Sequence, residues 1–190
     1  MKLYGSTTSP YVRRIRLWLN DTDYEFVNMD IFAGPWRALL KEKNPALKVP
    51  ALEDGEQMVF DSRVIFRYLQ TKSSAAPLTW EQENLLTLID AANDSFVQLM
   101  MLKRSGVEQD RELLFFRLQL ERIETALTTL NTHAEQGDFS QWDYPTMCLF
   151  CLIDWVSFRE LWGFAAYPAL QALLKTYQDD SIIKATDPRI

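Results

Sequence analysis

The sequence predicts an α/β domain followed by an all-α domain in a chain of 190 residues. In the first part, short runs rich in β-branched and aromatic residues alternate with helical patterns in the order βαβαββα. A break rich in small residues, Lys72–Pro77, then interrupts this pattern. Beyond residue 80, apolar residues recur only at helical spacing. We therefore expect an α/β domain at residues 1–76 and a helical domain at residues 77–190.

The chain opens with a predicted strand, a hydroxyl-rich turn and a helix. Ser9 is a favourable N-cap, and Pro10 suits the first helical position because no amide donor is needed there. The unpaired amides and the dipole of such a helix end stabilise an anion, for example a thiolate, carboxylate or phosphate. On these residues alone, Ser9 either only caps the helix or also takes part in chemistry. Three further hydroxyls lie in the same turn: Ser6, Thr7 and Thr8.

Composition and turn signals predict the next two elements. Aromatic and β-branched residues favour a strand at residues 24–29. A short helix is expected over residues 36–43, where Asn44-Pro45 ends it, because the residue before a proline is pushed away from helical geometry. The domain therefore begins strand, helix, strand, helix.

A hairpin and a third helix complete the α/β domain. Asp54-Gly55 is a favoured two-residue turn between strands at residues 49–53 and 57–60. Asp61-Ser62 then begins a helix, with apolar residues on one face up to Leu69.

Four helices are expected in the second domain. Thr79 and Gln82 have capping-box spacing and begin the first helix. A second runs from about Gln109 to Leu130. A third contains both cysteines, and a fourth follows Pro168. The apolar face predicted for the second helix includes Leu114, Leu118, Leu120, Ile123 and Leu127.

Charge and composition exclude several classes of function. The formal charge of −6 argues against a nucleic-acid groove, which needs clustered Lys and Arg, and the basic cluster Arg13, Arg14, Arg16 is small. A hydrophobic content of 47% is ample for packed cores. We find no secretory signal and no apolar run long enough to span a bilayer, so the expected location is the cytoplasm, without a membrane partner.

The cysteines and the histidine give little support for redox or metal chemistry. Cys148 and Cys151 form a CxxC pair, but they lie inside an apolar helical run with no other ligands near in sequence. We interpret them as buried structural cysteines rather than a redox or metal motif. His133 is the one histidine, so His-based catalysis is poorly supported, and no metal is expected.

Three motifs resemble stretches of known families. The stretch from Ser9 to Arg13 resembles the Cys-Pro-Tyr-Cys motif of glutaredoxins with both cysteines replaced. Residues 44–52 are similar to the Asn-Pro-x-Gly-x-Val-Pro-x-Leu stretch of cytosolic glutathione S-transferases, and Phe60-Asp61-Ser62 resembles their acid-Ser turn. With the helical second half, the resemblance covers essentially the whole chain. It implies a thioredoxin-like N-terminal domain that binds glutathione.

The resemblance also implies roles for individual residues. Ser9 matches the position of the catalytic hydroxyl or cysteine, and Thr8 is the alternative. Pro50 matches a proline after a cis bond, and the backbone of Val49 matches the segment that pairs with the cysteinyl part of glutathione. Asp61 and Ser62 match the turn that binds the γ-glutamyl end, although simple helix capping also explains this pair. The glutathione-binding set is therefore Ser9, Lys48, Val49, Pro50, Asp61 and Ser62.

The implied reaction is attack of glutathione, as a substrate, on a small hydrophobic electrophile. The candidate electrophile pocket consists of residues that could equally be core or surface: Tyr11, Phe96, Met100, Met101 and Arg104. A homodimer is also implied. Its candidate contacts are Arg63, Phe66 and Arg67 on one protomer with Asp90 and Asp94 on the other. Alternatives are a glutathione-dependent isomerase or dehalogenase, and a non-catalytic adaptor such as the stringent starvation protein.

Some residues depart from the family pattern. Leu47 stands where the family commonly has glycine. Thr146 is followed by Leu149 rather than by the usual aspartate, so the capping signal of that helix is incomplete. The tail after Leu170 is short, and we therefore expect an open or unusual electrophile pocket.

Overall fold

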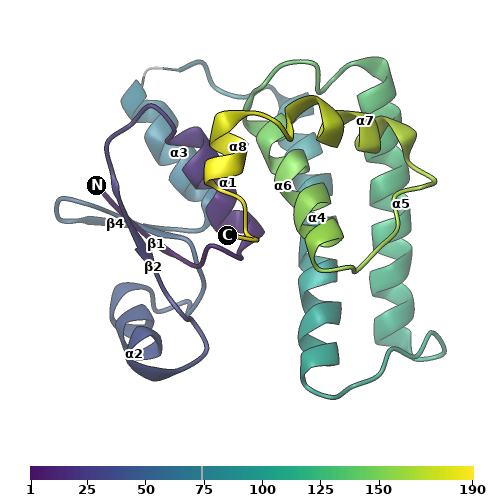
Figure 1. Cartoon of the computed structure of the whole chain (residues 1–190), viewed down its shortest axis with the longest axis horizontal. Coiled ribbons are helices and arrows are strands. Elements are labelled where there is room, and N and C mark those ends of the chain that lie inside the picture. The colour runs from purple at the N-terminus through teal and green to yellow at the C-terminus, as the bar shows by residue number, and fades with distance from the viewer. Residues whose placement is uncertain (74) are drawn as a thin grey trace. The chain divides into compact units, whose positions relative to one another are not determined.

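The computed structural model describes residues 1–73 and 75–190, which divide into two compact units (Figure 1). Unit 1 comprises Met1–Pro77 together with Asp180–Ile190, and unit 2 comprises Leu78–Asp179. The sequence predicts that the whole chain after residue 76 belongs to the helical domain. The structure differs for Asp180–Ile190, because this segment makes its hydrogen bonds to the first helix of unit 1.

Unit 1 contains a four-stranded mixed sheet with strand order β2-β1-β3-β4. Strands β1 and β2 are parallel, and the β1–β3 and β3–β4 pairs are antiparallel. This is the thioredoxin-like arrangement that the resemblance implied. Its elements are β1 (Lys2–Gly5), α1 (Pro10–Trp18), β2 (Glu25–Asn28), α2 (Gly34–Lys43), β3 (Ala51–Asp54), β4 (Gln57–Phe60), α3 (Ser62–Ser73) and the C-terminal α8 (Ser181–Ala185).

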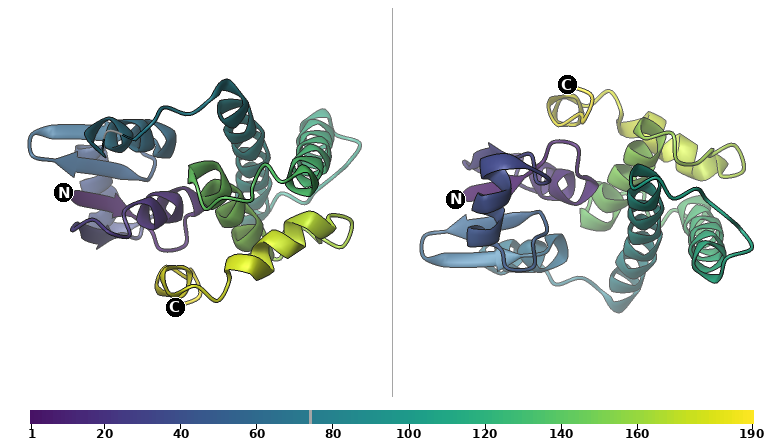
Figure 2. Two further views of the ribbon diagram at one scale, coloured as in Figure 1. Left: turned by 90° about the horizontal axis from the view of Figure 1, so that it is seen from above. Right: turned by 90° about the horizontal axis from the view of Figure 1, so that it is seen from below.

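Helices cover both faces of this sheet. Tyr4, Met29, Leu40 and Ala51 form a buried cluster that joins α2 to one face. Leu3 has no exposed surface and, one residue from Tyr4, points to the opposite face, because side chains alternate along a strand. Helices α1 and α3 pack against each other on that opposite side, and α2 lies in front of the sheet when seen from below (Figure 2).

A polar cluster ties α2 to the sheet. The Glu53 carboxylate accepts hydrogen bonds from Tyr4 Oη at 2.9 Å and from Lys43 Nζ at 2.7 Å. The hydrogen bond from Lys43, followed by the one from Tyr4, holds the pKa of Glu53 below its ordinary value. Burial, and then the bond to Glu53, raises the pKa of Tyr4. The Tyr4 phenol therefore stays protonated as a donor at neutral pH.

The regular secondary structure of unit 2 is helical. Its helices are α4 (Trp80–Arg104), α5 (Leu114–Gln136), α6 (Tyr144–Phe158) and α7 (Pro168–Tyr177). Helix α6 is buried from Tyr144 to Val156, as expected for a helix that is apolar all round. Helix α4 packs on α5 and α6. Contrary to the sequence analysis, α4 is long and apolar enough, by length and composition alone, to cross a membrane, a property that it shares with core helices.

Polar side chains cap these helices. The predicted capping box of Thr79 and Gln82 is confirmed. The expectation of an incomplete cap on α6 is wrong, because Asp143 caps that helix. Its Oδ1 accepts from the backbone N of Thr146 at 3.1 Å and from the Thr146 hydroxyl at 2.8 Å. Gln82 Nε2 also donates to Asp143 Oδ2 at 3.0 Å, so one acid joins the starts of α4 and α6.

The limits of α5 differ from the prediction. The helix begins at Leu114 rather than near Gln109, because Asp110 forms a local turn in which its Oδ1 accepts from the backbone N of Glu112. It continues past Leu130 to Gln136, where Gly137 closes it with a φ of 89°. Of the predicted apolar face, Leu120, Ile123 and Leu127 are buried, whereas Leu114 and Leu118 are 60% and 44% exposed.

Candidate functional site

The turn between β1 and α1 has the geometry that the sequence predicted. Ser9 is the N-cap in extended geometry, and its Oγ accepts from the backbone N of Val12 at 3.4 Å. Pro10 occupies the first turn of the helix. Gly5 allows strand and helix to approach closely, because a Cβ at this position would lie 2.5 Å from a Val12 methyl group. The role of Ser9 as a cap is therefore confirmed.

The other hydroxyls of the turn lie close to one another. The Ser6 and Thr8 hydroxyls are 3.2 Å apart and hydrogen bonded. The backbone N of Thr7 donates to Asn28 Oδ1 at 3.1 Å, which ties the turn to the end of β2. The backbone N of Ser9 donates to the carbonyl of Ser6 at 3.0 Å. The sequence analysis missed Asn28, which has no recognisable signal because it lies on a different element.

A second loop is organised by a buried asparagine. Asn44 is 1% exposed; its Nδ2 donates to the carbonyl of Lys48 at 2.7 Å, and its Oδ1 accepts from the backbone N of Ala46 at 2.9 Å. The Val49–Pro50 bond is cis, as the resemblance implied. The strand ladder begins only at Ala51. Asn44 thus fixes the loop that presents Val49, a role that was not predicted from the sequence, where this residue was interpreted as a helix stop and as the first residue of a family-like stretch.

Leu47 in this loop has a left-handed backbone with a φ of 57°. The family commonly has glycine at this position, and glycine is the residue that adopts positive φ without a steric cost. The backbone N of Leu47 donates to the Asn44 carbonyl at 2.9 Å, which closes the turn. The departure at Leu47 therefore leaves the turn in place and adds local strain.

Asp61 and Ser62 form the third part of the site. Asp61 also has a left-handed backbone, with a φ of 71°. Its Oδ1 accepts from the backbone N of Arg63 at 2.8 Å and of Val64 at 3.3 Å, so the capping role considered for this residue is confirmed. Asp61 is exposed, and Ser62 is 3% exposed.

The register of the sheet brings these three parts to one edge. Tyr4 at the end of β1 pairs with Ala51 at the start of β3, and Ala51 pairs with Phe60 at the end of β4. The Ser9 turn follows β1, the cis bond before Pro50 precedes β3, and Asp61 follows β4. The N-termini of α1 and α3 therefore open toward the same sheet edge, where their dipoles favour bound anions.

The remaining predicted residues are spread over both units. Lys48 is exposed, and its carbonyl is the acceptor for Asn44. Tyr11 is half-buried, and the guanidinium carbon of Arg14 lies 5.0 Å from its ring centre. Both belong to unit 1.

The other candidates of the electrophile pocket lie on α4 in unit 2. Phe96 is 2% exposed and packs edge to face on Trp162, with ring centres 6.0 Å apart. Met100 is half-buried and Met101 is 37% exposed. Arg104 is the last residue of α4, and its charge, after burial, contributes to lowering the pKa of Arg159.

The basic cluster on α1 has a structural role that the sequence analysis missed. Arg13 is 3% exposed and Arg14 is 1% exposed, so the cluster is not an exposed basic patch. Arg13 and Arg16 both donate to backbone carbonyls of the C-terminal segment. The partners are separated from α1 by most of the chain, and no local pattern could have revealed them.

The two cysteines of α6 are buried thiols, in agreement with the structural interpretation. Within residues 1–73 and 75–190, we find no group of three or more His, Cys, Asp or Glu side chains that could hold a metal ion. His133 Nδ1 lies 2.7 Å from Asp138 Oδ2 near the end of α5.

Comparison with known proteins gives a consistent result. The sequence profile "Glutathione S-transferase, N-terminal domain" matches residues 3–77. Glutathione S-transferase 3 of Zea mays is 39% identical over 75 residues, which cover 38% of this chain and 34% of that protein. A probable maleylacetoacetate isomerase of Caenorhabditis elegans is 37% identical over 75 residues, or 40% and 35% of the two chains. The matches to these two curated relatives thus span about a third of their length.

A solved structure resembles both units together. The crystal structure of a glutathione S-transferase from Methylobacillus flagellatus KT with GSH bound has a TM-score of 0.83. The superposition covers 97% of this chain and 98% of the other chain, at 24% sequence identity. At that identity the likeness establishes the fold and not the activity.

Proposed function

We propose that this chain, whose residues 3–77 match the glutathione S-transferase N-terminal domain, is a glutathione transferase, which stabilises the thiolate of bound glutathione for attack on a small hydrophobic electrophile. The observation that carries this proposal is the sheet register. It brings the Ser9 turn, Val49 and Asp61 to one edge, and these three features suit the three parts of a glutathione molecule.

Ser9 would stabilise the sulfur. Its Oγ accepts from the amide of Val12, which leaves the hydroxyl proton to donate to another acceptor. A thiolate at the N-terminus of α1 would accept this hydrogen bond and would also benefit from the helix dipole. Ser9 is not the nucleophile in this mechanism. The sulfur of glutathione forms the new bond to the electrophile after its proton has been lost to solvent. In a displacement the leaving group departs with the bonding electron pair, and in an addition the adduct takes up a proton from solvent.

The other two parts of glutathione would bind to backbone and carboxylate groups. Val49 lies just before the β3 ladder, where an extended cysteinyl segment can pair with its main chain. Asp61 would accept from the γ-glutamyl ammonium, and the N-terminus of α3 with Ser62 would bind the adjoining carboxylate. Lys48 and Pro50 flank Val49 and complete the proposed set.

The electrophile would be held by side chains that, apart from Arg104, are of low polarity. We keep Tyr11, Met100, Met101 and Arg104 as candidates for this pocket. Phe96 would act only through the packing of α4 within unit 2, since it is buried against Trp162. Glutathione enters as a substrate, and the mechanism requires no metal.

The experiment that tests this function is a titration of the bound thiol. The absorbance of the glutathione thiolate is followed against pH in the binary complex, for the wild-type protein, Ser9→Ala and Thr8→Ala. We expect Ser9→Ala to raise the pKa of the bound thiol toward the free value and Thr8→Ala to leave it unchanged. Ser9→Thr is the matched control, because it retains both the hydroxyl and the cap. If the pKa of the bound thiol rises in Thr8→Ala and not in Ser9→Ala, Thr8 is the catalytic residue.

A second candidate is a glutathione-dependent isomerase, favoured by the match to the probable maleylacetoacetate isomerase. Such an enzyme uses the same thiolate but regenerates glutathione in each cycle. Mass balance separates the two functions: a transferase consumes one glutathione for each electrophile, whereas an isomerase consumes none. A protein that binds no glutathione at all would instead support the adaptor function.

A further inference from the structure

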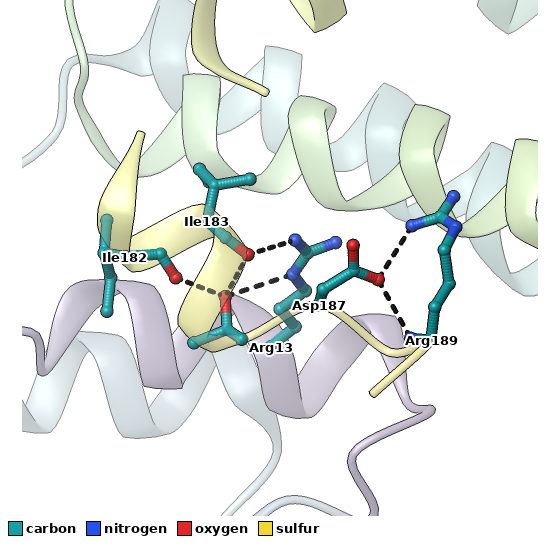
Figure 3. A network of polar contacts seen from close by, with 6 residues as sticks. Arg13, Ile182, Ile183, Asp187 and Arg189 are labelled. Atoms are coloured by element: carbon teal, nitrogen blue, oxygen red, sulfur yellow. Dashed lines mark hydrogen bonds and ion pairs between the residues drawn. The ribbon is translucent and has the colours of Figure 1, made fainter. Parts of the chain in front are cut away.

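The C-terminal segment is bound to α1 by a buried arginine. Arg13 Nη2 donates to the carbonyl of Ile183 at 3.0 Å, and Arg13 Nε donates to Thr186 Oγ1 at 3.3 Å (Figure 3). Arg13, Ile183 and Thr186 are 3%, 4% and 2% exposed. Arg16 Nη2 adds a hydrogen bond to the Ala185 carbonyl at 3.2 Å. We call the segment Asp180–Ile190 the strap.

Helix α1 and the strap satisfy each other's polar groups. The last carbonyls of a helix have few partners within it. In α8 the Ala185 carbonyl accepts from Arg16, and the Ile183 carbonyl accepts from Arg13 as well as from the backbone N of Thr186 at 3.3 Å. Thr186 accepts from Arg13 and donates to the carbonyl of Ile182 at 2.8 Å. The Thr186 hydroxyl is thus a second link between the guanidinium and the backbone of α8, beside the direct bond from Arg13 to the Ile183 carbonyl.

The end of the strap is closed by its own turn. Asp187 Oδ1 accepts from the backbone N of Arg189 and from Arg189 Nη1, both at 2.9 Å (Figure 3). The charge of Arg13 also acts on the Asp187 carboxylate. This turn follows directly on Thr186, so it limits the freedom of the residue that contacts Arg13.

Arg13 belongs to the first turn of α1, where the candidate thiolate site lies. The backbone N of Arg13 donates to the carbonyl of Ser9 at 3.1 Å. The same residue therefore closes the turn that begins at Ser9 and anchors that turn to the strap. The first turn of a helix ordinarily opens most readily, because its amides have fewest partners within the helix.

From this arrangement we propose that the strap is a positioning device for the first turn of α1, with Arg13 and Thr186 as the positioning residues that hold Ser9 and its neighbouring amides in place. The restraint on the turn follows from the contacts alone. The consequence for a bound thiolate rests on the proposed function. Neither residue touches the sulfur in this scheme, and both act through the geometry of the turn.

Hydrogen exchange tests the restraint in the full-length protein. Thr186→Val retains the shape of the side chain and removes the hydroxyl link, whereas Thr186→Ser retains the hydroxyl. We expect the backbone amides of residues 12–14 to exchange about fivefold or more faster in Thr186→Val, with Thr186→Ser close to wild type. Amides of α2 serve as an internal control for general loosening of unit 1. Unchanged exchange at residues 12–14, or an equal increase in α2, would overturn the proposal.

The thiol titration tests the functional consequence. In Thr186→Val we expect the pKa of bound glutathione to rise by about half a unit, which is about threefold less thiolate below the pKa. The affinity for glutathione should change less. If the amides of residues 12–14 exchange faster in Thr186→Val but the pKa of bound glutathione is unchanged, the strap only stabilises the fold, and the positioning role is refuted. If the wild-type protein binds no glutathione, the proposed function fails, and the exchange experiment alone decides on the strap.

Arg13→Lys provides a second variant that retains the charge. A lysine ammonium can reach one acceptor but cannot reproduce the paired Nε and Nη2 donors of the guanidinium. We therefore expect Arg13→Lys to accelerate exchange at residues 12–14, as Thr186→Val does. If the amides of residues 12–14 exchange in Arg13→Lys at the wild-type rate, the charge of Arg13 restrains the turn rather than its link to Thr186. That result would overturn the proposal.

Discussion

The carboxylate of Asp61 accepts a hydrogen bond of 2.8 Å from the backbone N of Arg63, so the acid proposed to bind glutathione is also the cap of α3. These two roles can be separated by substitution. Asp61→Asn retains an oxygen acceptor and tolerates a left-handed backbone, but it loses the charge. We expect it to weaken glutathione binding by about 1.5 to 3 kcal/mol, the range for hydrogen bonds to charged groups, with little change in stability.

Asp61→Ala should lose both roles. The missing cap is expected to cost about 0.5 to 2 kcal/mol of stability, in addition to the same loss of glutathione affinity. Calorimetric titration and chemical denaturation of the two variants give the comparison. If Asp61→Asn binds glutathione with unchanged affinity, Asp61 does not belong to the γ-glutamyl site and serves only as a helix cap.

The left-handed backbone of Leu47 allows a prediction that does not depend on function. At most positions a protein with glycine is less stable than the same protein with alanine. At a backbone φ of 57°, however, alanine retains the backbone strain and glycine relieves it. Leu47→Gly and Leu47→Ala remove the same side-chain contacts, apart from one methyl group. We expect Leu47→Gly to be the more stable by about 1 kcal/mol in thermal or chemical denaturation. Greater stability of Leu47→Ala would contradict the backbone assignment.

The predicted dimer contact at Phe66 is wrong, because the side chain is buried within the protomer. It is 1% exposed and lies edge to face against Trp18, with ring centres 4.8 Å apart. Phe66→Ala is expected to cost about 3 to 5 kcal/mol of stability through the cavity that it creates. The midpoint of chemical denaturation measures this cost, and a near-neutral effect would contradict the core assignment.

The homodimer itself remains a prediction. Its contacts would lie on the exposed face of α3, where Val64 is 50% exposed and Arg67 lies one turn further, together with Arg63. The partner helix α4 would contribute Asp90 and Asp94. We expect sedimentation equilibrium to give a dimer for the wild type and a dissociation constant raised about tenfold or more for Val64→Arg. A wild-type monomer at micromolar concentration would refute the dimer.

The strap should respond to acid through Asp187. Burial alone would raise the pKa of this carboxyl, but the hydrogen bonds and charge of Arg189, with the charge of Arg13, lower it below the ordinary value of 3.8. A lowered folded-state pKa means that the stabilisation is complete above about pH 4 and is lost as the pH falls through the folded-state value. Once the observed rates are divided by the intrinsic exchange rate at each pH, the protection of the amides of residues 12–14 should therefore fall at acid pH in the wild type, and Asp187→Asn should reduce this dependence.

Local rules account for what could be predicted from the sequence. Ser9 with Pro10, Asp54-Gly55 and the Thr79 capping box each depend on a few adjacent residues, and each lies where the pattern indicated. The order of strands and helices in the first domain follows from the same signals. Helix limits were less predictable, since at the start of α5 the local turn of Asp110 competes with the helical pattern.

The sequence by itself determined the two classes of domain, the caps and turns, and the motifs that carry the family resemblance, because all of these depend on neighbouring residues. Only the tertiary structure decided which distant groups meet. Sheet register gathers Ser9, Val49 and Asp61 at one edge, and packing buries Phe66. The contact between Arg13 and Thr186 joins residues 173 positions apart. A buried guanidinium must find acceptors, but which carbonyls supply them depends on how the end of the chain returns to α1.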